Sequence, residues 1–188
     1  MKGLKKLNEK KLLYRVMKKK DPEAYGKLYD FYVEKIFRFV YYKISNREET
    51  EDLVSDIFLK AWHYLIGDSN KDVNNFNAFI YRIARNSVID VYRKRANKQE
   101  CSLDQIGGQI AVESNFKNIE LKQEVDIILK GLSKLKEDYQ EIIILKYIEE
   151  LSTKEIAQVM EKSQANVRVT SHRAIKVLKK VLNESDKN

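Results

Sequence analysis

Apolar residues recur at intervals of three and four along most of the chain, which is the spacing of one face of an α-helix. Residues 21–66 are therefore predicted to be helical. Their first apolar stripe consists of Tyr25, Leu28, Tyr29, Tyr32, Val33, Ile36, Phe37 and Val40. Asp21 and Pro22 predict the start of this helix, because aspartate caps free N–H groups and proline has no N–H to leave unbonded.

Two further amphipathic stretches follow the first. A second helix is predicted from about Arg47 to Leu65, and the polar loop from Gly67 to Asn75 ends it. Its predicted buried face consists of Leu53, Ile57, Phe58, Ala61, Trp62 and Leu65. A third helix is predicted over residues 76–95. It buries Phe79, Ile80, Ile83, Ala84, Val88 and Val91. These helices together predict one compact α-domain.

The helical pattern breaks over residues 97–119, where turn-prone residues such as Gly107 and Gly108 accompany scattered apolar ones. We interpret this stretch as an interdomain linker. Helical spacing resumes at residues 119–132 and 137–149, and two short helices are expected after them. The predicted fold class is all-α, with two small helical domains joined by a flexible linker.

The second domain contains a predicted helix-turn-helix. Its first helix lies within residues 151–160, where Ser152 and Glu155 have the spacing of a capping box. Ser163 is expected to begin the second helix. One face of that helix carries Val167, Ala174, Leu178 and Val181. Ala157 is small because the second helix has to cross close over it.

The second helix of this motif offers a surface for reading duplex DNA. Such a helix lies in the major groove, where arginine recognises guanine, and asparagine or glutamine recognises adenine. Residues 163–182 carry five basic side chains and no acidic one, so phosphates can be neutralised as well. The candidate DNA-contacting residues are Gln164, Asn166, Arg168, His172, Arg173 and Lys176. For His172, an ordinary surface position is an equal alternative.

Composition narrows the class of protein. The 188 residues permit one domain or two small ones, and 6 Gly with 1 Pro are too few for turn-dense β folds. A single cysteine, Cys101, and two histidines argue against a disulfide framework or a metal site, and no cofactor is expected. No secretory signal and no membrane-spanning stretch is apparent, which predicts a soluble, cytoplasmic protein.

The net charge of +8 favours an anionic partner, but the charge is unevenly distributed. Acidic residues gather at the start of the second predicted helix. They are Glu48, Glu49, Glu51, Asp52 and Asp56. The helix dipole explains some of these carboxylates but does not need five. Because such a surface repels DNA, it indicates a basic protein partner.

The third predicted helix interleaves aromatic and basic residues, an arrangement that suits melted or single-stranded nucleic acid. Bases stack on the rings while cations hold the backbone. The residues are Tyr81, Arg82, Arg85, Asn86, Asp90, Tyr92, Arg93, Lys94 and Arg95. For Tyr81 and Tyr92 individually, packing inside the domain is the favoured interpretation.

Several stretches together resemble the extracytoplasmic-function sigma factors, the two-domain class of specificity subunits of bacterial RNA polymerase. Residues 21–39 resemble the opening helix of that family, and EDLVSDIFLKAW at residues 51–62 is similar to its acidic core-binding motif. FIYRIARNSVIDVYRKR at residues 79–95 is similar to the promoter-melting helix. VRVTSHRA at residues 167–174 is similar to part of the family's fourth conserved region. The stretches occur in the family's order.

The resemblance implies a sigma factor that binds core RNA polymerase and promoter DNA, and that is not an enzyme. It implies a basic N-terminal extension at residues 1–20, region 2 at 21–96, a linker at 97–119 and region 4 at 120–188. No small-molecule substrate and no membrane insertion are implied. An inhibitory anti-sigma factor is a further implied partner.

The resemblance also implies roles for individual residues. Docking on core polymerase is expected of Asp52, Leu53, Val54, Asp56 and Phe58. Contacts to the minus-ten element are expected of Asn70, Tyr81, Arg82, Arg85, Asn86 and Arg93, with the loop at 67–75 capturing a flipped base. The minus-thirty-five element is expected to bind the candidate residues of the helix-turn-helix named above.

Two positions depart from the family pattern. Glu161 stands in the turn of the helix-turn-helix, where glycine is often found, and glutamate tolerates left-handed backbone poorly. Ser171 stands where an inward-facing apolar residue is usual, which predicts loose packing.

Three other interpretations remain open on the residues alone. A stand-alone helix-turn-helix regulator would bind a palindromic operator as a homodimer, but it gives the acidic residues no role. A protein-interaction adaptor is disfavoured, because the second helix mixes Asn, Gln, Arg and His rather than carrying charge alone. An enzyme is least favoured, since no arrangement of catalytic residues or phosphate-binding glycines is apparent.

Overall fold

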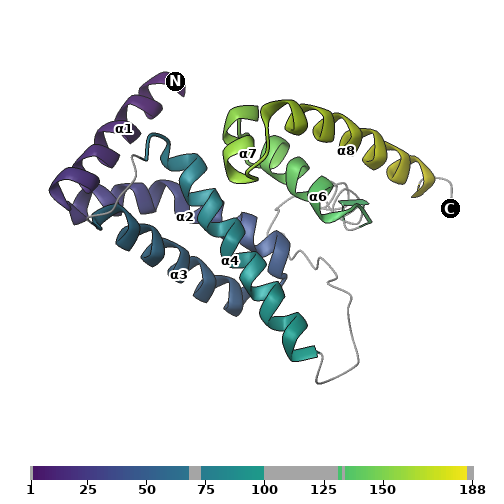
Figure 1. Cartoon of the computed structure of the whole chain (residues 1–188), viewed down its shortest axis with the longest axis horizontal. Coiled ribbons are helices and arrows are strands. Elements are labelled where there is room, and N and C mark those ends of the chain that lie inside the picture. Colours follow the sequence, from purple (N-terminus) through teal and green to yellow (C-terminus); the bar gives the residue numbers. More distant parts are fainter. Residues whose placement is uncertain (1, 68–72, 100–130, 133, 186–188) are drawn as a thin grey trace, which may run out of the picture. The chain divides into compact units, whose positions relative to one another are not determined.

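A computed structural model describes residues 2–67, 73–99, 131–132 and 134–185 of the chain (Figure 1). Every regular element in these residues is a helix, which confirms the predicted all-α class. The chain divides into two compact units, one of residues 1–41 with 46–104 and one of residues 42–45 with 105–188.

The first unit is built mainly from α1 (Lys2–Lys19), α2 (Pro22–Ile44), α3 (Arg47–Ile66) and α4 (Phe76–Gln99). The predicted starts of α2, α3 and α4 are confirmed. Helix α4 continues past the predicted end at Arg95, so residues 97–99 belong to a helix and not to the expected linker. The rest of that linker, residues 100–119, lies outside the described residues.

Helix α1 lies where the sequence predicts only a basic extension. Its apolar residues Leu13 and Val16 are buried, and the helix packs on α3 and α4. Glu9 accepts a hydrogen bond from the hydroxyl of Tyr32 on α2. A short lysine-rich helix is marginal alone, so these contacts supply much of its stability.

Aromatic rings fill the centre of the first unit. Tyr32 and Phe39 of α2 meet Phe76 and Tyr81 of α4 edge to face, with ring centroids 5.2 Å and 5.5 Å apart. All four side chains are buried. Each such pair adds about 0.5–1.5 kcal/mol beyond the burial of its area. These pairs fix α4, and with it the exposed face of that helix, against α2.

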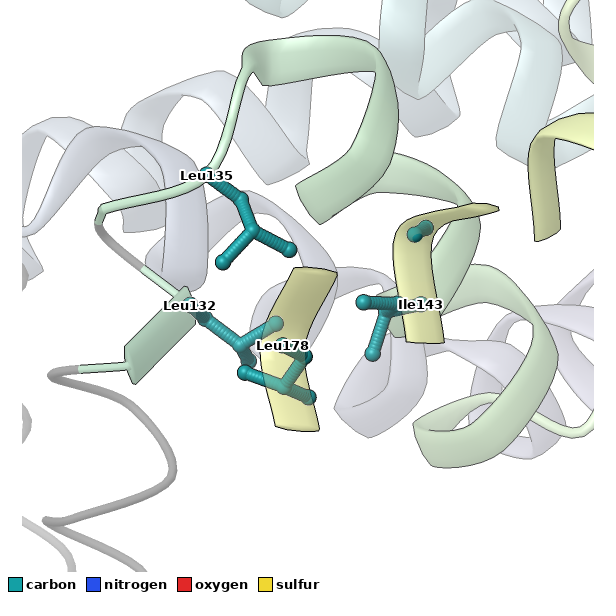
Figure 2. Packing of buried hydrophobic residues seen from close by; sticks show 5 residues of the cluster. Leu132, Leu135, Ile143 and Leu178 are labelled. Carbon is teal, nitrogen blue, oxygen red and sulfur yellow. The ribbon is translucent and has the colours of Figure 1, made fainter. Parts of the chain in front are cut away.

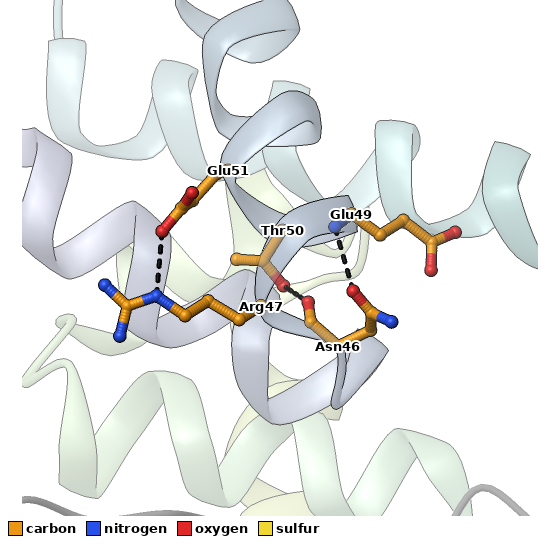
Figure 3. A network of polar contacts seen from close by, with 5 residues as sticks. All are labelled: Asn46, Arg47, Glu49, Thr50 and Glu51. Carbon is orange, nitrogen blue, oxygen red and sulfur yellow. Dashed lines mark hydrogen bonds and ion pairs between the residues drawn. The ribbon is translucent and has the colours of Figure 1, made fainter.

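Local hydrogen bonds define the start of α3 (Figure 3). The side-chain oxygen of Asn46 accepts from the N–H of Glu49 at 3.0 Å, and the Thr50 hydroxyl donates to the Asn46 carbonyl at 2.6 Å. Ser45, just before the cap, has a φ of 56°. The chain therefore reverses between α2 and α3 without a glycine.

The second unit contains α6 (Glu137–Ile143), a π-helical turn η1 (Ile144–Ile148), α7 (Thr153–Val159) and α8 (Gln164–Ser185). The single helix predicted at residues 137–149 is thus divided between α6 and the π turn. The last helix is not short as expected but 22 residues long. Its apolar face continues beyond Leu178 through Val181 and Leu182, which both pack on the core of this unit.

Apolar side chains of residues 132–143 pack against α8 (Figure 2). The buried cluster consists of Leu132, Leu135, Ile143, Ala174 and Leu178. Gly131 approaches α8 closely, because a Cβ atom at that position would lie 2.8 Å from Leu182 Cδ2. This packing holds α8 along α6, with which it makes its main contact.

Candidate functional site

An acidic ridge runs along the exposed side of α3. Asp52 and Asp56 are one helical turn apart, and both are exposed. Leu59 continues the same side of the helix, and 55% of it is exposed. Within the described residues, no hydrogen bond or ion pair engages either aspartate side chain. We call Asp52, Asp56 and Leu59 the α3 ridge.

Two of the other acidic residues near the start of α3 are bound within the first unit. Glu49 pairs with Arg95 of α4, and Arg47 Nε lies 2.9 Å from Glu51 Oε1 (Figure 3). Exposed pairs of this kind contribute only about 0.2–1 kcal/mol each. They neutralise two carboxylates, so Asp52 and Asp56 remain available to a basic partner.

Three residues expected at the polymerase-docking surface lie inside the first unit instead. Leu53, Val54 and Phe58 are buried, because the 3.6-residue period turns them toward the inside of the unit. The carbonyl of Phe58 accepts a hydrogen bond from the Tyr25 hydroxyl, and burial raises the pKa of Tyr25 well above its usual value. These residues support the α3 ridge from beneath and do not form its surface.

Leu59 is a surface residue that the helical pattern alone does not identify. Apolar residues in a helix are normally assigned to the core, but Leu59 follows Asp52 by seven positions and Asp56 by three. That spacing places Leu59 on the same side of the helix as Asp52 and Asp56, and it could have identified Leu59 from the sequence. The α3 ridge thus combines two carboxylates with an apolar contact.

The outward face of α4 carries polar and basic groups. Arg82, Asn86 and Arg93 lie on one side of the helix; Asn86 and Arg93 are exposed and Arg82 is half-buried. Arg85, next to them, is also half-buried. Arg93 makes a 3.7 Å contact with Asp90, which is weak because both side chains are largely exposed. This face can accept a nucleic-acid backbone.

One residue expected to contact the minus-ten element, Tyr81, is not on that face. Tyr81 is 0% exposed and its ring packs on Phe39, so no base can stack on it. The packing interpretation of Tyr81 is therefore confirmed. Asn70 lies outside the described residues. At the described end of its loop, Asn75 caps α4 by accepting from the Ala78 N–H at 3.1 Å.

Helices α7 and α8 form the predicted helix-turn-helix. Ser152 and Glu155 make the predicted capping box, in which the Ser152 N–H donates to the Glu155 carboxylate at 2.9 Å. Ser163 caps α8 by accepting from the Asn166 N–H at 3.2 Å. Ala157 is buried on α7, which packs against α8. Both predicted helix starts are confirmed.

The turn between these helices contains one residue with left-handed backbone, and that residue is not a glycine. Glu161 has a φ of 55°, and the Lys162 N–H donates to the Ala157 carbonyl at 3.0 Å. Lys162 Nζ lies 2.6 Å from Asp138 Oδ2 on α6, which fastens the turn to the rest of the unit. Glutamate in this conformation is strained by about 1–2 kcal/mol.

Every side chain predicted to contact the upstream promoter element is exposed on α8. They are Gln164, Asn166, Arg168, His172, Arg173 and Lys176. In the described part of the chain, no ion pair neutralises Arg168, Arg173 or Lys176. Val169, an apolar residue not among the predicted DNA contacts, is 49% exposed beside them. An apolar group there suits the methyl group of thymine.

Ser171 lies behind this surface and is only 2% exposed. Its hydroxyl accepts a hydrogen bond from Lys146 Nζ of the π turn at 2.9 Å. The position where the sequence predicts loose packing is instead closed by a polar contact. That contact ties the middle of α8 to η1, so it fixes the orientation of the exposed face.

The described residues contain no group of three or more His, Cys, Asp or Glu side chains arranged to hold a metal ion. Among the helices described, none has both the length and the apolar character needed to cross a bilayer. The candidate sites are the charged surfaces of α3, α4 and α8.

Comparison with protein families gives two matches. Residues 28–98 match the family described as Sigma-70 region 2, and residues 126–178 match the family described as Sigma-70, region 4. The first match contains the α3 ridge and the exposed face of α4. The second contains the helix-turn-helix.

Relatives with assigned functions resemble the chain over most of its length. It is 30% identical to the ECF RNA polymerase sigma factor SigM of Bacillus subtilis, over 83% of this chain and 93% of SigM. It is 28% identical to SigW of the same organism, over 89% of this chain and 94% of SigW. It is also 28% identical to BldN of Streptomyces coelicolor, but spans only 61% of the length of that protein.

Two solved structures share the fold. CnrH, determined in complex with the cytosolic domain of CnrY, is 22% identical, with a TM-score of 0.71 over 94% of this chain and 98% of CnrH. RpoE of Bartonella quintana, determined with the anti-sigma factor NepR, is 23% identical, with a TM-score of 0.72 over 86% of this chain and 98% of RpoE.

Proposed function

Because the chain belongs to the extracytoplasmic-function sigma factors of bacterial RNA polymerase, we propose that separate surfaces of its two units bind the polymerase and the promoter. Sigma factors of this family direct promoter recognition and are not enzymes. We assign region 2 to residues 21–99, because α4 continues to Gln99, the linker to 100–119 and region 4 to 120–188. The protein acts in the cytoplasm, with the polymerase.

The α3 ridge is the proposed docking surface for core polymerase. The observation that carries this assignment is the pair of exposed, unbound carboxylates of Asp52 and Asp56, one turn apart on a rigid helix. A basic partner surface would neutralise both, and Leu59 would add an apolar contact. The buried Leu53, Val54 and Phe58 keep the ridge in place.

Promoter DNA is assigned to the other two surfaces. Arg82, Arg85, Asn86 and Arg93 of α4 are proposed to bind the melted minus-ten element, together with the loop that contains Asn70. The exposed side chains of α8 are proposed to bind the minus-thirty-five element as a duplex. Their exposure and the lack of ion pairs to the described α8 arginines support this assignment.

The docking assignment is tested by run-off transcription with bacterial core polymerase on genomic DNA fragments, followed by mapping of the RNA 5′ ends. The wild-type chain should direct initiation at discrete sites, which also supplies a promoter for later experiments. Asp52→Lys with Asp56→Lys should lower initiation at least tenfold, because loss of a desolvated charge pair costs about 2–5 kcal/mol.

The matched control is Asp30→Lys with Glu34→Lys on α2. Both residues are exposed and lie four positions apart, as Asp52 and Asp56 do. Their replacement by lysine changes the net charge by the same amount. This control should initiate like the wild type. Full activity of the Asp52 and Asp56 variant, or an equal loss in the control, contradicts docking through the α3 ridge.

An anti-sigma factor is a further proposed partner. The structural relatives CnrH and RpoE were each determined with another protein bound, and NepR is an anti-sigma factor. We expect an inhibitor of this chain to compete with core polymerase for the α3 ridge. A candidate inhibitor should suppress run-off transcription and lose affinity for the Asp52 and Asp56 variant; undiminished binding to that variant contradicts competition at this surface.

A further inference from the structure

A second charged ridge, on α1, is not used by any surface described so far. Lys10, Tyr14 and Lys18 follow one another at four-residue intervals, so they lie on one side of the helix. All three are exposed, and Tyr14 is 60% exposed. The two lysines are about 12 Å apart along the helix axis, with the ring between them. We call these residues the α1 ridge.

The α1 ridge forms part of a groove that encloses about 230 Å³. Val73 and Asn74, which precede α4, also line this groove. Leu13 and Met17 of α1 contribute apolar lining. The groove is smaller than the roughly 300–1,000 Å³ pockets that bury a small-molecule ligand, so it suits part of a longer ligand.

The cations of this groove have no protein counter-charge in the described part of the chain. No ion pair or hydrogen bond there engages Lys10, Tyr14 or Lys18. The acidic groups nearest to them in the sequence are already bound. Glu9 accepts from the Tyr32 hydroxyl, and Asp21 binds Arg15. The groove therefore favours an anionic ligand.

We propose that this groove binds single-stranded DNA of the melted promoter, beside the loop that precedes α4. A base stacks on Tyr14, Lys10 and Lys18 hold the phosphates on either side, and Asn74 offers a hydrogen-bonding group to a base edge. Cations around an exposed ring are typical of surfaces that bind single strands. In duplex DNA the base faces are stacked on one another, so none is available to stack on Tyr14. An acidic protein would bind the lysines alone, which leaves Tyr14 without a role.

This inference rests on the proposed function and extends it, because it adds α1 to the path of the melted strand. The test uses holoenzyme assembled from core polymerase and the full chain, with two fork-junction fragments of a promoter mapped by run-off transcription. One fragment ends at the minus-ten element. The other continues downstream as a non-template single strand.

Tyr14→Ala should weaken binding to the longer fragment about tenfold and leave binding to the shorter fragment unchanged, because one base stack is lost. Lys10→Ala with Lys18→Ala should have a similar effect and should also reduce the salt dependence for the longer fragment. All three positions are exposed, so the thermal unfolding of both variants should match that of the wild type.

The matched control is Lys11→Ala with Lys19→Ala, which removes the same charge at the same spacing from the same helix. Both lysines are exposed and do not line the groove. This control should bind both fragments like the wild type. An equal loss in the control would show a general effect of charge and overturn the proposal.

Other outcomes distinguish failure of this inference from failure of the proposed function. If the wild type binds both fragments and the α1 ridge variants do so equally well, this inference fails and the proposed function stands. A loss of core polymerase binding by the Lys10 and Lys18 variant would make the ridge a polymerase contact, and would overturn the proposal. Wild-type holoenzyme that binds neither fragment contradicts the proposed function itself.

Discussion

Single residues with left-handed backbone connect the helices of this chain. Lys20, Ser45, Glu150 and Glu161 have φ values between 49° and 56°, and each lies between two described helical elements. Residues other than glycine are strained in this conformation by about 1–2 kcal/mol each. The helices on either side must supply that energy through their packing, which explains why the turns persist without glycine.

The strain at Glu161 gives a prediction about stability. Glu161→Gly should raise the free energy of unfolding of the second unit by about 1 kcal/mol, because glycine adopts this backbone without a steric penalty. Urea denaturation measures the change. Glu161→Ala is the control, since it removes the carboxylate but keeps the strain, and it should give no gain. An equal gain in both variants would show that charge, not backbone conformation, limits stability here.

At the scale of helices, an ion pair fastens α1 to the start of α2. Arg15 Nη2 lies 2.6 Å from Asp21 Oδ2, and Asp21 Oδ1 caps α2 by accepting from the Ala24 N–H at 3.0 Å. The backbone hydrogen bond from Ala24, helped by the guanidinium of Arg15, lowers the pKa of Asp21 below its ordinary value. The charged carboxylate therefore stabilises the folded chain.

This linkage predicts how stability depends on pH. A carboxyl with a lowered pKa in the folded state stabilises fully above its unfolded pKa, and loses that contribution as pH falls through its folded pKa. The difference in unfolding free energy between wild type and Asp21→Asn should be constant from about pH 7 to 5 and shrink below about pH 4. Urea titrations across this range measure it.

The control for that series is Asp30→Asn, at an exposed carboxylate on α2. Its stability difference from the wild type should stay nearly constant with pH. If the Asp21→Asn difference also stays constant down to about pH 2, the carboxylate of Asp21 does not stabilise the fold as proposed.

Helix starts could be predicted from the sequence because they depend on neighbouring residues. Asp21 caps α2, Ser152 and Glu155 cap α7, and Ser163 caps α8, each within three or four positions. The same holds for the all-α class and for the order of α2, α3 and α4. Interactions between residues close together in the chain determine these features, so they can be predicted from the sequence alone.

Features that depend on the assembled units could not be predicted in this way. Helix α1 owes its stability to burial of Leu13 and Val16 rather than to its lysine-rich sequence. The pairing of Glu49 with Arg95 joins residues 46 positions apart, and Ser171 meets Lys146 across 25 positions. The sequence shows five similar carboxylates on α3, but only the folded unit separates the paired from the available ones.

At the scale of the whole molecule, each charged surface has one proposed task. We propose that the α3 ridge binds polymerase, that α4 with α1 holds melted DNA, and that α8 reads duplex DNA. Polymerase brings the two promoter elements to both units at once, so modest affinities combine into specific binding. The net charge of +8 is spread over both units, so the free chain should bind DNA weakly.

Run-off transcription on two templates tests this division of tasks most directly. One template is the complete duplex promoter, and the other is a pre-melted fork that lacks the minus-thirty-five element. Arg173→Ala should weaken recognition of the complete promoter by about 1–3 kcal/mol and lower initiation from it accordingly. Initiation from the fork should be unchanged. Asp52→Lys with Asp56→Lys should lower initiation from both. A loss by Arg173→Ala on both templates, or on neither, contradicts the account.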